Sequence, residues 1–346
     1  MKILSFTATT LLFYITGLAQ TNPQQKDSIK QQTEQLKEVI VTGNVLLGSK
    51  FEAQNKTGSA TYISKEDLKK FSFTNINRIL RTVPGINIYE EDGFGLRPNI
   101  SLRGTSPERS AKINLMEDGV LIAPAPYSAP AAYYFPTIGR MEAIEVLKGS
   151  SQIQYGPNTT GGAINMISSR IPEKFSGKAS IAAGNYDSRN TQLVLGNSFK
   201  NFGFVTDYFN YSSDGFKDLD GGGNTGFDKT DYMAKFRVNT DLDAKIYQSL
   251  LFKIQYSEEE ANETYLGLTD ADFEESPFRR YRASSEDVMN AKHQQYQLTH
   301  FIRLSPSLDI RTTGYLNRFK RNWYKLDDVN LGERVSINNI LSSPEN

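Results

Sequence analysis

The second half of the chain alternates apolar and polar positions with a period of two. Around residues 230–240, for example, Tyr232 and Phe236 alternate with Asp231 and Lys235. This period predicts β-strands with one apolar and one polar face, as in a strand between lipid and the lumen of a barrel. A soluble sandwich gives the same alternation, so the pattern alone leaves both open. Comparable runs predict strands near residues 190–199, 202–211, 230–240, 245–257 and 293–304, the first strand starting near residue 176.

The connections between these strands favour a barrel. Short turns at residues 200–201, 241–244 and 305–307 alternate with long loops at residues 212–229 and 258–292. Outer-membrane barrels sort their loops in this way, because one rim faces the periplasm and the other faces the exterior. Residues 173–346 are therefore predicted to be the N-terminal part of a transmembrane antiparallel β-barrel, with about seven strands. Since a barrel that encloses a plug has about 22 strands, we expect an incomplete barrel.

Residues 52–172 have a different character and predict a small α+β domain that would plug the barrel. Two apolar runs, Ile144–Leu147 and Ala163–Ile167, are separated by a segment rich in Gly, Ser and Asn. Ser64, followed by acidic residues, predicts the start of a helix. Asp118-Gly119 between two apolar runs predicts a hairpin turn. The predicted fold class is mainly β, with an α+β plug inside a barrel.

The N-terminus predicts export. Residues 1–19 combine a positive start, an apolar core and a small-residue end at Ala19, which is typical of a signal peptide. Residues 20–51 form a polar, flexible segment, interrupted by one β-branched run at residues 36–43. That run predicts either a strand that pairs with the sheet edge of a partner protein or the first strand of the next domain. It consists of Leu36, Lys37, Glu38, Val39, Ile40, Val41, Thr42 and Gly43.

Composition narrows the classes of function. Lys and Arg number 39 and Asp and Glu also number 39, so the sequence has no basic surplus that would indicate nucleic-acid binding. The absence of Cys excludes disulfides and thiolate metal sites. Residues 221–226 fit a G-x-G-x-x-G pattern but precede a strand, not a helix, so we do not interpret them as a dinucleotide site. We expect no catalytic residues, no resident metal and no cofactor.

Residues 36–170 contain a series of short motifs in a fixed order. Besides residues 36–43, they are Val83–Ile86, Ile100–Gly104, Glu117–Val120, Ile144–Gly149, Tyr155–Pro157 and Gly161–Asn165. Taken together, these motifs resemble the N-terminal part of TonB-dependent outer-membrane receptors. The resemblance implies a plug gating a barrel in the outer membrane of a Gram-negative bacterium, contacting outer-membrane lipid. It also implies that residues 36–43 are a TonB box, which recruits TonB with its ExbB/ExbD energising complex, and that the substrate is a ferric chelate, with iron carried as cargo.

Within that family, two segments look most like ferric citrate receptors: Ala123–Pro130 and Leu266–Phe273. Only residues 20–35 separate the expected cleavage site from the box, so we do not expect a periplasmic signalling domain. The alternatives are import of another scarce solute, such as an oligosaccharide or cobalamin, and a passive porin or adhesin. A soluble β-rich enzyme is disfavoured by the loops sorted by length.

Two groups of charged and polar residues are candidates for the site. The first group is predicted to contact the substrate, because the planar guanidinium of Arg can donate two hydrogen bonds to one carboxylate. The alternative for each of these loop residues is a charge that is solvated by water. Charges enclosed in a lumen need partners, so a second group is predicted to lock the plug to the barrel wall, the alternative being ordinary surface charge. The ligand candidates are Arg97, Arg109, Tyr127, Asn158, Arg279, Arg280 and Arg282, and the lock candidates are Arg103, Glu145 and Lys148.

Overall fold

The computed structural model describes most of the chain from Leu47 onward. The predicted signal peptide and residues 36–43 lie outside the described residues. Within the described ranges, no helix is long and apolar enough to cross a membrane. The described residues are 47–56, 58–70, 75–122, 129, 134–149, 152, 155–156, 160–330 and 332–342.

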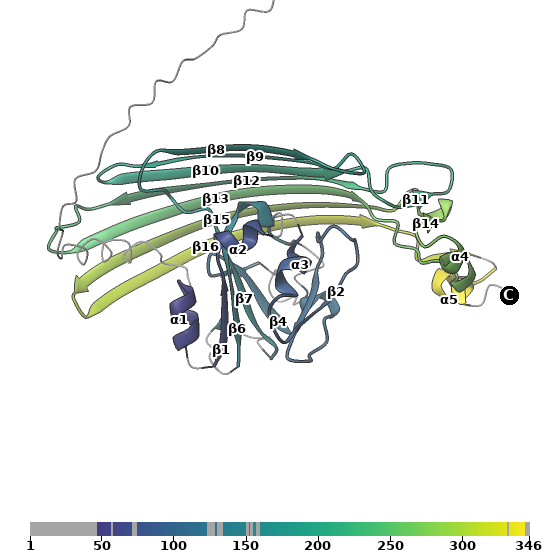
Figure 1. The fold of residues 1–346 in the computed structure, drawn as a ribbon, viewed down its shortest axis with the longest axis horizontal. Coiled ribbons are helices and arrows are strands. Elements are labelled where there is room, and N and C mark those ends of the chain that lie inside the picture. Colours follow the sequence, from purple (N-terminus) through teal and green to yellow (C-terminus); the bar gives the residue numbers. More distant parts are fainter. Residues whose placement is uncertain are drawn as a thin grey trace, which may run out of the picture. The chain divides into compact units, whose positions relative to one another are not determined.

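The N-terminal part is built on a five-stranded sheet in the order β1-β6-β7-β4-β5 (Figure 1). The apolar runs that the sequence singled out form two of its interior strands, β6 and the central strand β7, which pair antiparallel with Ile144 opposite Met166. β4 and β7 pair in parallel. The strands are β1 (Ser59–Ile63), β4 (Ile113–Glu117), β5 (Val120–Leu121), β6 (Met141–Lys148) and β7 (Gly162–Ser168), and β2 (Ile86–Tyr89) pairs separately with β3 (Asn99–Leu102).

Short helices pack on this sheet and close its core. The helices are α1 (Lys50–Asn55), α2 (Lys65–Lys69) and α3 (Ile76–Leu80). α2 begins at Ser64 as predicted, with a capping box in which Ser64 and Asp67 satisfy each other's backbone N–H groups. The main core is a largely aliphatic cluster shared by α2, α3 and the strands, whose members include Leu68, Ile76, Ile79, Leu80, Ile100, Leu102, Leu115, Ile144, Val146, Ile164 and Met166. A smaller cluster, which includes Ala53 of α1, consists of Leu47, Ala53, Met116, Leu147 and Ala163.

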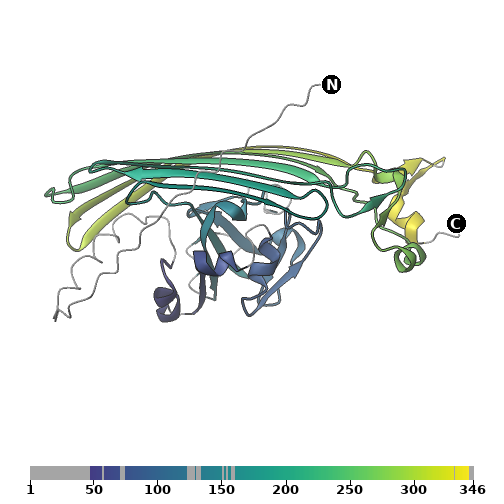
Figure 2. The ribbon, with the colours of Figure 1, turned by 45° about the horizontal axis from the view of Figure 1, so that its top comes forward.

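The C-terminal part is a seven-stranded antiparallel sheet in which each strand pairs with its neighbours in sequence (Figures 1 and 2). Its polar positions are the buried ones: Asp231 is 0% exposed and Lys253 2%, whereas Tyr232 and Phe236 are each 41% exposed. Apolar outside and charged inside is the arrangement of a barrel wall. The strands are β8 (Ser176–Ala183), β9 (Arg189–Ser198), β10 (Phe202–Ser213), β12 (Phe227–Asn239), β13 (Tyr247–Asn262), β15 (Val288–Ser305) and β16 (Leu308–Tyr324).

The seven strands confirm the predicted number and the alternation of short turns with long loops, but the strands are longer than predicted. The sequence pattern places residues 258–262, which begin with three glutamates, in a loop, but β13 continues through them. The charges are tolerated there because Glu258 pairs with Lys292 and Glu259 pairs with Lys229 on the adjacent strands. The long connections hold β11 (Asp218–Leu219), α4 (Asp270–Glu275) and β14 (Arg279–Arg280), and β17 (Asp328–Asn330), β18 (Arg334–Ser336) and α5 (Ile337–Ser342) follow β16.

Candidate functional site

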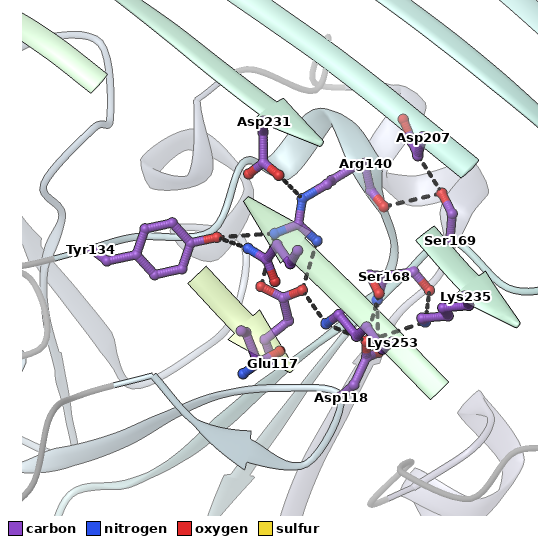
Figure 3. Close-up of polar contacts among 12 residues, drawn as sticks. Glu117, Asp118, Tyr134, Arg140, Ser168, Ser169, Asp207, Asp231, Lys235 and Lys253 are labelled. Carbon is purple, nitrogen blue, oxygen red and sulfur yellow. Dashed lines mark hydrogen bonds and ion pairs between the residues drawn. The ribbon is translucent and has the colours of Figure 1, made fainter. Parts of the chain in front are cut away.

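A buried layer of charged residues joins the N-terminal domain to the polar face of the seven-stranded sheet (Figure 3). On the domain side it begins at the predicted hairpin turn. Asp118 and Gly119 adopt positive φ angles of 48° and 77°, which suits the tight turn between β4 and β5. The turn places Glu117, the last residue of β4, beside Asp118, and both carboxylates are buried.

Arg140 ties these carboxylates to the sheet. It ends the 3₁₀ turn η4 (Ile138–Arg140), and its side chain is fully buried. Its guanidinium donates to both oxygens of Glu117, at 2.6 and 2.9 Å, and to the hydroxyl of Tyr134 at 3.0 Å. Its Nε lies 2.9 Å from the carboxylate of Asp231 on β12. One side chain thus bridges an acid of its own domain and an acid of the sheet.

Two lysines of the sheet complete the layer. Lys253 of β13 lies 2.5 Å from Glu117 and 2.7 Å from Asp118, and Lys235 of β12 lies 3.1 Å from Asp118. Asp118 also accepts from the backbone and side chain of Ser168. Three buried cations therefore face three buried anions, and the layer is electrically balanced. Its members are Glu117, Asp118, Arg140, Asp231, Lys235 and Lys253.

The pKa values of the carboxylates reflect this balance. Burial raises the pKa of Glu117, but Arg140 and Lys253 outweigh burial and hold that pKa at about 2. Burial acts in the same way on Asp118, and Lys235 and Lys253 hold its pKa far below the usual range. Both groups are therefore ionised at neutral pH, as a buried carboxylate is only when it is paired.

Hydrogen bonds outside the charged layer also connect the N-terminal domain to the sheet. Gln192 of β9 donates to the carbonyl of Gly139 at 2.9 Å, and Ser169 donates to Asp207 of β10 at 2.6 Å. A Cβ atom on Gly139 would lie only 2.0 Å from the ring of Phe209. Glycine is therefore required at this position by a direct approach of the backbone to β10.

A cavity of about 720 Å³ lies at the end of the sheet that carries the long loops. Arg97 lies at its base and pairs with Glu259 at 2.5 Å and Glu263 at 2.7 Å. Asp92 holds the backbone that leads to Arg97 by accepting from four consecutive backbone N–H groups. The wall also includes Tyr89, Phe94, Arg109, Lys217, Phe227, Glu263, Tyr265, Leu266, Leu268, Phe273 and Arg280.

The predicted ligand residues fall into three groups. Arg97, Arg109 and Arg280 line this one cavity although the sequence separates them widely. Arg279 instead pairs with two aspartates, and Arg282 is exposed. Tyr127 and Asn158 lie outside the described residues. Arg97 is also a link between the domain and the sheet, because both of its carboxylate partners belong to β13 or to the loop after it.

The predicted lock residues make contacts within their own domain. Glu145 accepts from the backbone of Leu47 and Gly48 and from Asn165, and it is fully buried. Lys148 donates to the carbonyl of Pro84 at 2.6 Å, and burial lowers its pKa. The Arg103 side chain is exposed, and its backbone has a positive φ of 58°. Their contribution to a lock stays a prediction.

Sequence reasoning missed the residues that do join the two parts. Asp118 was interpreted only as a turn residue and Glu117 only as part of a motif, while Arg140 was not considered. A signal was present on the sheet side: Asp231, Lys235 and Lys253 occupy the lumen-facing positions of the alternating pattern. Ionised side chains at such positions require partners.

Residues 52–163 match the family model described as the TonB-dependent Receptor Plug Domain. The chain carries a TonB-dependent receptor plug domain. With the seven-stranded sheet, it has the fold of solved receptors of this kind. The crystal structure of the unliganded ferric citrate transporter FecA superposes with a TM-score of 0.69 at 20% identity, covering 81% of this chain and 42% of that one.

Other solved structures agree on the fold. The ferric yersiniabactin uptake receptor FyuA from Yersinia pestis matches with a TM-score of 0.63 at 18% identity, covering 80% of this chain and 43% of its own. The ferric-catecholate import receptor Fiu from E. coli K12 matches with 0.60 at 17%, covering 78% and 39%. The chain thus spans about two-fifths of the length of these structures.

Proposed function

We propose that this chain supplies the plug and part of the barrel wall of a TonB-dependent importer of a ferric chelate in the outer membrane of a Gram-negative bacterium. The observation that carries the proposal is the buried, balanced layer between the plug domain and the polar face of the sheet. It is supported by the plug family match and by the structural similarity to the ferric citrate transporter FecA, the ferric yersiniabactin uptake receptor FyuA and the ferric-catecholate import receptor Fiu.

The layer suits a plug that must both seal and move. Buried ion pairs add little net stability, because the cost of removing two charges from water offsets their attraction, but they fix one docking position. When such a plug loosens, each charged group can regain water. An apolar interface would have no such compensation. Ionic docking therefore gives a defined closed state that an external pull can open.

The cavity suits the cargo. Its volume of about 720 Å³ lies within the roughly 300–1,000 Å³ that is usual for sites of small ligands. Among the described residues, aromatic side chains line it together with four cations, and the five carboxylates of the wall are Glu90, Glu91, Asp92, Glu108 and Glu263. Among ferric chelates we propose ferric citrate as the first candidate. The segment Leu266–Phe273, which resembles ferric citrate receptors, contributes Leu266, Leu268 and Phe273 to the wall.

The force that opens the plug would be exerted by TonB through residues 36–43. In this proposal the run pairs as an added strand with TonB, energised by ExbB and ExbD, once substrate occupies the cavity. Main-chain pairing needs backbone donors, and Pro removes one. Val39→Pro or Ile40→Pro is therefore expected to abolish energised uptake and to leave substrate binding unchanged. Gln25→Pro, in the polar segment before the run, is the matched control.

The test is uptake of radioactive iron by a strain that lacks its own copy and carries the full-length receptor. Iron is offered as ferric citrate, as a hydroxamate chelate and as a catecholate chelate. We expect energy-dependent uptake of at least one chelate, lost in the two box variants and kept in the control. Uptake that survives both box variants, or growth restored only on a nutrient other than iron, would refute the proposal.

A further inference from the structure

Two of the long loops are joined to each other beside the cavity. β11, in the loop after β10, pairs in parallel with β14, in the loop after β13. The backbone N–H of Asp218 donates to the carbonyl of Phe278, and that of Asp220 donates to the carbonyl of Arg280, both at 2.8 Å. This ladder fixes Lys217, the residue before β11, and Arg280 on the same cavity wall.

The two arginines of β14 differ in their charge environment. Arg279 is neutralised by two aspartates, with ion pairs of 3.0 Å to Asp220 and 2.8 Å to Asp272. Arg280 has no carboxylate within ion-pair distance among the described residues, and its guanidinium donates to the carbonyl of Pro277 at 3.1 Å.

Lys217, like Arg280, is a cation without an ion-pair partner among the described residues. Its ammonium donates to the hydroxyl of Thr264 at 3.0 Å, and the part of the chain that the structure describes offers it no carboxylate within ion-pair distance. Burial lowers the pKa of Lys217, and the neighbouring charge of Arg280 lowers it further. Burial also lowers the pKa of Arg280. Two cations therefore lie partly buried side by side, and the carboxylates of Glu263, Asp92 and Glu91 act on Lys217 only from beyond ion-pair distance.

The carboxylates of the same cavity are largely engaged elsewhere. Glu90 pairs with Arg81 at 2.7 Å, and Glu263 pairs with Arg97. Asp92 is occupied by backbone N–H groups, and Glu91 accepts from Asn99 at 3.0 Å. On the plug wall, Glu108 and Arg109 are adjacent and opposite in charge. An anionic group that enters beside Lys217 and Arg280 would thus meet two cationic donors that have no carboxylate within ion-pair distance among the described residues.

We propose that Lys217 and Arg280 form a subsite for a carboxylate group of the imported chelate. The inference rests on the proposed function and adds the chemical class of the group recognised. Arg280 supplies a planar fork that matches a carboxylate. Lys217 supplies a point charge. The β11–β14 ladder holds the pair in place before the ligand arrives, which reduces the cost of ordering the loops on binding.

The test is equilibrium binding to the purified full-length receptor of two probes, ferric citrate and the uncharged hydroxamate chelate ferrichrome. Lys217→Gln and Arg280→Gln are each expected to weaken ferric citrate binding about tenfold or more, because each removes a charge-assisted hydrogen bond. Lys217→Arg keeps the charge and should stay within about threefold of the wild type. Arg189→Gln removes an exposed cation that does not line the cavity, so binding should not change.

The outcomes separate the subsite from the proposed function. Ferric citrate binding that is equal in the wild type and in all variants would overturn the subsite and leave the importer proposal intact. Binding of ferrichrome but not of ferric citrate would also overturn the carboxylate assignment while supporting import. A receptor that binds neither probe would overturn the subsite, whereas the importer proposal is overturned only if none of the three ferric chelates, the catecholate included, is imported.

Discussion

Arg140→Met tests the docking layer most sharply, since Met keeps an unbranched side chain as far as the ε position and removes the charged guanidinium group. In the wild type the guanidinium serves Glu117, Tyr134 and Asp231 at once. After the substitution Glu117 keeps Lys253 as a partner at 2.5 Å. Asp231 loses the only ion-pair partner that the described residues give it, and it is 0% exposed.

The expected loss of docking free energy follows from the loss of the partner of Asp231. Removing one partner of a buried ion pair typically costs about 3–5 kcal/mol, because the remaining charge stays buried and uncompensated. Asp231→Asn should cost less, since Arg140 keeps Glu117. The double variant Arg140→Met/Asp231→Asn should cost less than the sum of the two, with a coupling energy of about 1–3 kcal/mol.

The assay is hydrogen exchange of the full-length receptor in detergent, with peptides from β6 and β7 as reporters of plug opening. The expected loss corresponds to a decrease of protection of roughly a hundredfold or more. Arg303→Met is the matched control, because Arg303 of β15 forms a largely exposed ion pair with Asp309 of β16 and surface pairs contribute little. Unchanged protection in Arg140→Met, or a loss no larger than in the control, would refute the reasoning.

Two further predictions concern the same interface. Gly139→Ala should destabilise plug docking by about 1–3 kcal/mol through overpacking against Phe209, as measured by the same exchange assay. Gly314→Ala is the control, because its Cβ would meet no atom within 4 Å, and it should have no such effect. Equal protection in the two variants would contradict the close approach of Gly139 to Phe209. Because Arg140 and Lys253 hold the pKa of Glu117 at about 2, below the value of about 4.3 in the unfolded chain, its contribution to docking is fully present above about pH 4.5 and is lost as the pH falls towards 2. The urea midpoint for plug release should therefore fall between pH 5 and pH 3 by more in the wild type than in Glu117→Gln, and an identical pH profile would count against ionised Glu117 as a docking group.

The period-two pattern was sufficient to predict the seven strands and their connections, because each strand needs one apolar and one polar face. The pattern did not predict where the strands end. Glu258 and Glu259 were interpreted as loop residues because acidic runs are usually solvated, yet Lys292 and Lys229 compensate them across the ladder. Cross-strand compensation depends on register, which the local sequence does not specify.

The site was predictable only in part. The sequence indicated that loop arginines gather near substrate, and Arg97, Arg109 and Arg280 do line one cavity. It did not indicate that Arg97 is neutralised by two glutamates while Arg280 is not. The docking layer was beyond local reasoning, because Glu117 and Lys253 lie 136 residues apart in the chain. Their pairing depends on how the plug domain meets the sheet.

The central claim is that the plug domain is docked on the inner face of the sheet and must loosen there for import. Since the chain contains no Cys, Gly139→Cys with Phe209→Cys places one thiol pair in the volume now filled by the Phe209 ring. We expect a disulfide to form in the full-length receptor in its native membrane, and iron uptake to stop until a reductant is added. A pair that stays reduced under oxidising conditions, or uptake that continues through the cross-linked receptor, would contradict the account.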